Sequence, residues 1–156
     1  MVKNLPSLSR KNMNFNEVKS GKTVLRNAIH AYKTEENSDE YIYLIAGVHG
    51  DEVEGVYVLE QLFSWLKETH SVDLPLVVIP IVNVDGFRVV TRGNANGVDL
   101  NRNLPAGNWI SEAPEKKYYP GTTPLSEPEN QYLVELFGKY PPRTIISFHS
   151  WKPLLN

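Results

Sequence analysis

The sequence predicts an α/β fold made of one domain. Segments with the composition of strands alternate along the chain with two predicted helices, one with apolar residues at helical spacing and one that opens with a capping box. This order is typical of a layered protein, in which helices cover a sheet and ligands bind beyond the carboxyl ends of the strands. With 156 residues, 41% of them hydrophobic, the chain can bury a single core.

The first half of the chain predicts two strands and one helix. Residues 1–21 are polar and are expected to be an irregular lead-in, without the apolar stretch of a signal peptide. Residues 22–32 and 41–46 predict strands, and the turn-like sequence TEENSDE lies between them. From 52 to 69 the apolar residues follow a helical period, with charged residues on the opposite side, so this segment predicts an amphipathic helix.

The second half predicts two strands, one helix and a long loop. Residues 75–82 form an apolar run, as expected of a strand buried on both faces. Residues 84–125 are rich in Gly, Asn and Pro and are expected to be mostly loop. The sequence SEPE is interpreted as a capping box, with Ser126 as the N-cap of a helix over 126–140. Residues 143–149 predict the last strand.

Charge and composition exclude several classes of function. A net charge of −2 provides no basic field for nucleic acid and no polybasic patch for a membrane surface. The longest apolar run, LPLVVIPIV, is too short to span a bilayer, so the cytoplasm is the expected location. Because the chain has no cysteine, a metal site would have to use His, Asp and Glu.

One such set of residues follows the strand at 41–46. His49 comes just after this strand, and Glu52 falls on the first turn of the next helix. Side chains three residues apart on such a turn project to one side, so both can reach one metal ion. The His-x-x-Glu pair alone is weak evidence, because composition produces it by chance in many chains. The neighbouring Asp51 and Glu54 are expected to cap the helix.

A second histidine in an equivalent position strengthens this interpretation. His149 ends the strand at 143–149, as His49 ends the strand at 41–46. If the two strands are parallel neighbours, both imidazoles lie at one edge of the sheet. Two histidines and the carboxylate of Glu52 form the three-ligand set of a catalytic zinc, with a fourth position for water.

Four motifs then suggest a family. VHGDEVEG, GVDLNRN, SEPE and SFHS occur in this order. Over about residues 20–152 the chain resembles the zinc carboxypeptidases of the M14 family, in particular the short bacterial branch of murein peptide amidases. The resemblance implies a three-layer α/β/α fold with a mixed, mostly parallel sheet that is incomplete at the C-terminus. Residues 1–156 would be a single domain, the N-terminal part of the catalytic domain.

The resemblance also assigns a cofactor and its ligands. It implies one Zn²⁺ per chain, held by His49, Glu52 and His149. Asp99 matches the carboxylate that supports the first zinc histidine through the distal ring nitrogen, which fixes the tautomer of that histidine.

Three further residues match the family's substrate-binding positions. Asn101 and Arg102 correspond to the pair that grips the terminal carboxylate of the substrate, and Arg92 to the arginine that polarises the scissile carbonyl. A guanidinium pairs bidentately with a carboxylate, which suits this assignment. The alternative is a polar loop that makes its own turns. The expected substrate is a peptide or murein peptide with a free carboxylate.

The sequence departs from the family in one respect. The family's general-base glutamate and its substrate-covering tyrosine lie well beyond the third ligand, and this chain stops seven residues after His149. Neither Glu112 nor Glu115 matches the position of the base. We therefore expect the base beyond residue 156, in a following segment or a second chain.

Three functional hypotheses remain open. The first is an enzyme, or its metal-binding half, that hydrolyses a peptide or amide bond next to a free carboxylate. A second is a non-catalytic module that binds zinc and a carboxylate. The third is an amino-acid deacylase of the related aspartoacylase or desuccinylase type. The family also implies a cis peptide bond between Ser150 and Trp151.

Overall fold

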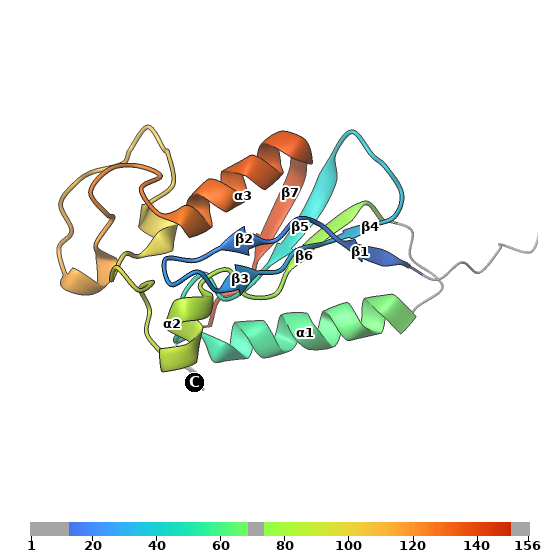
Figure 1. The fold of residues 1–156 in the computed structure, drawn as a ribbon, viewed down its shortest axis with the longest axis horizontal. Coiled ribbons are helices and arrows are strands. Elements are labelled where there is room, and N and C mark those ends of the chain that lie inside the picture. The colour runs from blue at the N-terminus through green and yellow to red at the C-terminus, as the bar shows by residue number, and fades with distance from the viewer. Residues whose placement is uncertain (1–12, 69–73, 151–156) are drawn as a thin grey trace, which may run out of the picture.

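The computed structural model describes residues 13–68 and 74–150, and its centre is a five-stranded sheet in the order β1-β4-β6-β5-β7 (Figure 1). The strands are β1 (Phe15–Glu17), β4 (Tyr32–Thr34), β5 (Tyr41–Ile45), β6 (Leu76–Ile79) and β7 (Pro142–Ser147). β5 is parallel to β6 and β7, whereas β4 is antiparallel to both β6 and β1. Within this sheet four strands therefore share one direction and β4 opposes them, as the expected mixed, mostly parallel sheet requires.

Helices cover the two faces of the sheet, which confirms the three-layer α/β/α fold. α1 (Val53–Glu68) lies against one face and α3 (Pro128–Lys139) against the other (Figure 1). The side chains of β5 alternate between these layers. Tyr43 and Ile45 pack in the cluster that includes α3, and Leu44 packs in the cluster that includes α1.

The hydrophobic pattern of the sequence explains both layers. All residues of β6 are buried, and Val77 and Val78 contribute to opposite core clusters, as predicted for a strand covered on both faces. On α1, the residues at helical spacing that face the sheet are buried: Val56, Leu59, Phe63 and Leu66. Full burial of one such side chain stabilises the fold by about 1.5–3 kcal/mol. Among the described helices, none combines the length and hydropathy needed to cross a membrane.

The N-terminal strand predictions were wrong. Within the expected lead-in the structure has β1, and in place of one strand over 22–32 it has a hairpin of β2 (Gly21–Lys22) and β3 (Ala28–Ile29) followed by β4. The cause lies far away in sequence. Asp85 accepts hydrogen bonds from the Thr23 hydroxyl (2.7 Å) and the Leu25 backbone N–H (2.9 Å), which hold the chain in a turn.

The segment 84–125 is mostly loop, as predicted, but it contains a short helix, α2 (Val84–Val89), and two 3₁₀ turns, η1 (Leu100–Arg102) and η2 (Lys116–Tyr118). α2 begins where the Asn83 side chain accepts a hydrogen bond from the Gly86 backbone N–H at 2.9 Å. A side-chain cap of this kind satisfies an N–H group that a helix start leaves free.

The predicted N-cap of the last helix was also wrong. α3 begins at Pro128, so Glu127 occupies the N-cap position and Ser126 precedes it. Proline favours the first helical position because its fixed φ suits the helix and the missing N–H is not needed there. The Ser126 hydroxyl instead donates to the Glu127 carboxylate at 2.6 Å.

Candidate metal centre

The site lies where β5 and β7 end side by side. The two strands pair in parallel up to Ile45 and Ser147, and the Phe148 backbone N–H continues the pairing to the Ile45 carbonyl at 2.8 Å. His49 follows β5 by four residues and His149 follows β7 by two, so the chain brings both to one edge of the sheet, as predicted. The loop before α1 approaches α2 so closely at Gly50 that an added Cβ would overlap the α2 backbone, so only glycine fits at this position.

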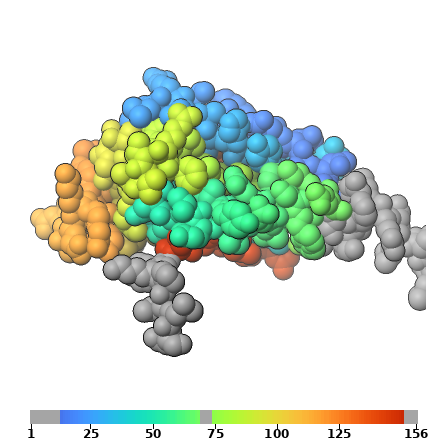
Figure 2. Space-filling view, turned by 90° about the horizontal axis from the view of Figure 1, so that it is seen from below, coloured from blue at the N-terminus to red at the C-terminus, as the bar shows by residue number. Residues whose placement is uncertain are grey.

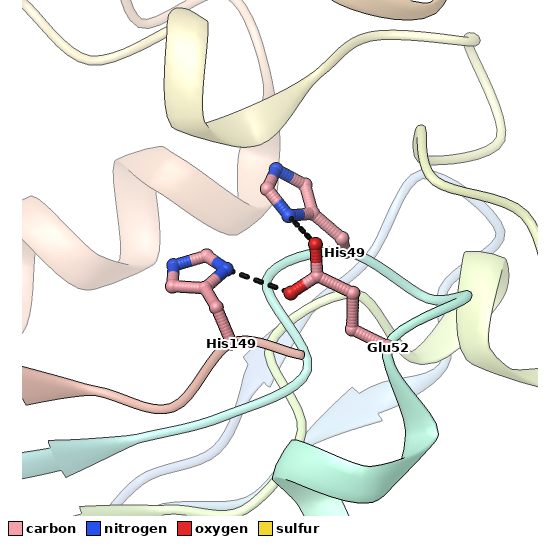
Figure 3. A group of neighbouring side chains, drawn as sticks. All are labelled: His49, Glu52 and His149. Carbon is pink, nitrogen blue, oxygen red and sulfur yellow. Dashed lines mark hydrogen bonds and ion pairs between the residues drawn. The ribbon is translucent and has the colours of Figure 1, made fainter. Parts of the chain in front are cut away.

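The three expected metal ligands lie together. The carboxylate of Glu52 sits between the imidazoles, with Oε1 2.8 Å from His49 Nδ1 and Oε2 2.8 Å from His149 Nδ1 (Figure 3). Among the described residues these three form the group that could hold a metal ion, and their ligand atoms lie within 4.8 Å of one another. Ligands around a tetrahedral ion with bonds of about 2.1 Å lie about 3.4 Å apart. The donor set and its spacing therefore fit zinc with small side-chain adjustments.

Asp99 supports the cluster from behind His49. Its side chain is fully buried, and Oδ1 lies 3.0 Å from His49 Nε2. Burial alone would raise the pKa of Asp99, but the hydrogen bond with His49 and the charges of His49 and Arg92 outweigh it, so the pKa is lowered. An ionised Asp99 keeps a proton on Nε2, which leaves Nδ1 as the nitrogen for a metal.

Glu52 is held in the ionised state that metal binding needs. Burial would raise its pKa, but the hydrogen bond with His149 and the charge of His49 lower it further than burial raises it. The Ser150 backbone N–H also donates to Oε2 at 3.1 Å. Because a metal competes with protons for its ligands, the lowered pKa extends the range in which Glu52 can bind a metal towards acid pH.

Arg92 is joined to this cluster. Its Nε and Nη2 donate to Asp99 Oδ2 at 3.0 and 2.9 Å, and its Nη1 lies 3.4 Å from Glu52 Oε1. Only 18% of the Arg92 side chain is exposed. The structure therefore places this guanidinium beside the ligands in a fixed orientation.

Asn101 and Arg102 follow Asp99 on η1, and the Asn101 backbone N–H donates to Asp99 Oδ1 at 3.0 Å. The Arg102 guanidinium donates to the Asn101 carbonyl at 3.3 Å, and among the described residues it has no ion pair with a carboxylate. Arg92, Asn101 and Arg102 together line a cavity of about 530 Å³. A guanidinium in a cavity wall that has no carboxylate partner among the described residues is available to a ligand of opposite charge.

Sequence reasoning missed the serines beside His149. Ser147 Oγ lies 3.0 Å from His149 Nε2, and the Ser150 hydroxyl donates to Glu54 at 2.8 Å. Glu54, expected only as a capping residue, thus ties the start of α1 to the segment after β7. The signal was present in SFHS, where a serine adjoins the histidine on one side. The expected cis bond before Trp151 lies outside the described residues.

Fold and site together define an α/β protein with a His–Glu–His metal-ligand set at the carboxyl edge of its sheet. The profile of the zinc carboxypeptidase family, Peptidase M14, matches residues 3–156, and the chain belongs to this family.

Several of the similar proteins are murein peptide amidases. The chain is 39% identical over 117 residues to murein peptide amidase A of Escherichia coli K12. This match covers 68% of this chain and 47% of the relative. The chain is 31% identical over 140 residues to murein peptide amidase A of Vibrio campbellii, covering 83% and 55%. The crystal structure of murein-tripeptide amidase MpaA from Escherichia coli O157 superposes with a TM-score of 0.70 at 32% identity, over 99% of this chain and 68% of that one. The chain thus spans about half the length of the curated relatives it matches.

Proposed function

We propose that the protein takes part in zinc-dependent hydrolysis of a peptide or amide bond next to a free carboxylate, as a carboxypeptidase or murein peptide amidase. The observation that carries the proposal is the pair of guanidiniums in one cavity wall. Arg92 is tied to the metal cluster through Asp99, and Arg102 has no acidic partner among the described residues. A substrate carboxylate on Arg102 would bring the neighbouring amide bond towards Arg92 and the cluster.

We assign one Zn²⁺ per chain to His49, Glu52 and His149, which offer two imidazole nitrogens and a carboxylate. Bound zinc supplies a Lewis acid and a water of lowered pKa. The protein's part is to orient the ligands, which Asp99 does for His49 by accepting from its distal nitrogen, so that Nδ1 faces the ion.

Arg92 and Arg102 perform different tasks in this proposal. Arg92, held by two hydrogen bonds to Asp99, stabilises the negative charge that develops on the scissile carbonyl oxygen. Arg102 and Asn101 bind the terminal carboxylate, because a guanidinium fork matches its two oxygens. Since Arg102 has no carboxylate partner among the described residues, a substrate carboxylate has no ion pair of theirs to displace.

We further propose that residues 1–156 form one domain, completed by a following segment or a second chain that carries the general base. Of the two loop glutamates, Glu115 pairs with Lys117 at 3.1 Å, and Glu112 matches no family position. The edge of β7 supports the idea of a completing segment. Ile145 and Ile146 are 46% and 45% exposed, and Figure 2 shows β7 in red along the margin of α1. Parallel strands are ordinarily covered on both faces.

The test compares zinc-loaded residues 1–156 with the protein extended to the length of its relatives. With a murein tripeptide as substrate, the short chain should lack a factor of about 10²–10⁴ in rate because it has no positioned base. The extended protein should hydrolyse the free-acid peptide in preference to its C-terminal amide.

The other outcomes separate the alternatives. Hydrolysis of N-acyl amino acids but not of peptides would identify a deacylase. Zinc-dependent binding of free-acid peptides without turnover in the extended protein would identify a binding module. Full turnover by residues 1–156 alone would show that the chain contains a base. The cytoplasm remains the expected location, and cell fractionation tests it.

A further inference from the structure

One aromatic ring lies against both guanidiniums of the cavity wall. The ring centroid of Tyr118, the last residue of η2, is 5.3 Å from Arg92 Cζ and 5.8 Å from Arg102 Cζ. Cations within about 6 Å of a ring centroid are attracted by the negative face of the ring. The ammonium of Lys117 lies 4.8 Å from the same centroid, so three cations surround one ring.

The segment that carries this ring is fixed to the metal cluster. The backbone carbonyl of Tyr119 accepts a hydrogen bond from the Asp99 N–H at 2.8 Å, and the Tyr118 N–H donates to the Glu115 carbonyl at 2.9 Å. Asp99 in turn contacts His49 and Arg92. The position of the ring relative to the cluster is therefore set by backbone hydrogen bonds rather than by its own side-chain torsions alone.

The two arginines depend on the ring to different degrees. Arg92 makes three hydrogen bonds to carboxylates, which hold its plane in place. Within the described part of the chain, the guanidinium of Arg102 makes one hydrogen bond of 3.3 Å, to the carbonyl of Asn101. A long side chain with one weak bond samples many rotamers in solution, and ordering it on binding costs free energy. The ring face of Tyr118 is a second described contact of Arg102.

We propose that Tyr118 is a positioning residue, which holds the guanidinium of Arg102 at a fixed separation from Arg92. This role rests on the proposed function, in which Arg102 binds the substrate carboxylate and Arg92 faces the adjacent carbonyl. The ring also offsets the repulsion between two like charges that share one cavity. The pair then recognises a carboxylate and a neighbouring carbonyl together, which selects substrates cleaved next to a chain end.

The experiment measures binding of two probes to the zinc-loaded protein by titration calorimetry: acetyl-alanyl-alanine and its C-terminal amide. Tyr118→Leu removes the ring, and Tyr118→Phe keeps it without the hydroxyl. Tyr119→Leu is the matched control, because within the described chain the Tyr119 ring lies over no guanidinium. Zinc content and the urea-unfolding midpoint are measured for every variant.

Tyr118→Leu should weaken binding of the free acid about 3- to 10-fold, leave binding of the amide unchanged and retain zinc. Tyr118→Phe and Tyr119→Leu should stay within about twofold of the parent, since the first keeps the ring face. In an Arg102→Ala background, Tyr118→Leu should add no further loss, because the residue through which it acts is gone. This cycle separates positioning from a general effect on folding.

Each contrary result has a distinct meaning. If the parent prefers the free acid and Tyr118→Leu binds it equally well, the role of Tyr118 is overturned and the proposed function stands. A loss in Tyr118→Phe as large as in Tyr118→Leu also overturns it, since the ring face is then not the cause. If the parent binds both probes equally, the carboxylate grip itself is wrong, and the role of Tyr118 is overturned with it.

Discussion

Replacing Asp99 by asparagine should break its hydrogen bonding either to His49 in the metal centre or to the neighbouring Arg92. Each oxygen of this buried carboxylate has its own partners. Oδ1 faces His49 Nε2 at 3.0 Å and the Asn101 N–H at 3.0 Å, and Oδ2 accepts two bonds from Arg92. Asparagine has nearly the same shape but one acceptor oxygen, so its amide N–H₂ must meet donors on one side.

Either orientation of the new amide is unfavourable. If N–H₂ faces Arg92, a guanidinium that is 18% exposed loses its main partner, and the metal-free protein should lose about 2–4 kcal/mol of unfolding free energy. If it faces His49, the imidazole must accept at Nε2 and carry its proton on Nδ1, the nitrogen that zinc needs. Loss of such a supporting contact typically weakens metal binding about 10- to 100-fold.

Zinc affinity should be measured by competition with a chromophoric chelator at neutral pH, and stability by urea unfolding in EDTA. Asp85→Asn is the matched control. Asp85 is buried and accepts from Thr23, Leu25 and Asn27, away from the cluster. It should lose stability yet keep zinc affinity within about twofold of the parent, since it supports no ligand. Unchanged zinc affinity together with unchanged stability in Asp99→Asn, or an equal loss of zinc affinity in Asp85→Asn, would refute the reasoning.

Three further predictions follow from the same contacts. His149→Ala should lose most of its zinc, because two ligands hold the ion poorly; elemental analysis that still finds stoichiometric zinc would contradict the assignment. Arg102→Lys should keep fold and zinc but weaken free-acid peptide binding by about 1.5–3 kcal/mol, with no change for the amide. Burial raises the pKa of Glu129 from its ordinary 4.5, and the charge of Glu127 adds to this. The folded state therefore holds this proton more tightly, and stability falls as pH rises from about 4.5 through the raised pKa. Glu129→Gln lacks this loss, so the difference in unfolding free energy should move in its favour between about pH 4 and pH 7; a constant difference would show that Glu129 does not titrate abnormally.

Sequence reasoning worked where the signal was local and strong. β5 and β6 are apolar runs, α1 has a helical period and α3 follows the SEPE sequence, so their existence was predicted although the start of α3 was not. The turn after β2 was missed because Asp85, which holds it, lies 62 residues from Thr23. No sequence pattern near residue 23 indicates that its hydrogen-bond partner is so distant. α2 was missed because six residues are too few to show a helical period.

The same distinction applies to the site. His49, Glu52 and His149 could be selected from strand ends and spacing, and the structure brings them together. The arginines came from the family resemblance, since a polar loop shows no period that assigns roles. Neither the spacing of residues nor the family resemblance pointed to Tyr118. Its importance lies in contacts with residues 16 and 26 positions away, which the order of the sequence does not show.

The pairing of β5 with β7 has a consequence for how the protein matures. Glu52 and His149 are 97 residues apart, and they meet only because the last described strand inserts beside a central one. During synthesis one edge of β5 stays unpaired with β7 until residues 142–147 have left the ribosome. Under the proposed zinc assignment the ligand set is complete only after that late event, and a nascent chain in which β7 has not yet paired with β5 would offer two ligands instead of three. Stable metal binding would then require that β7 has already paired with β5.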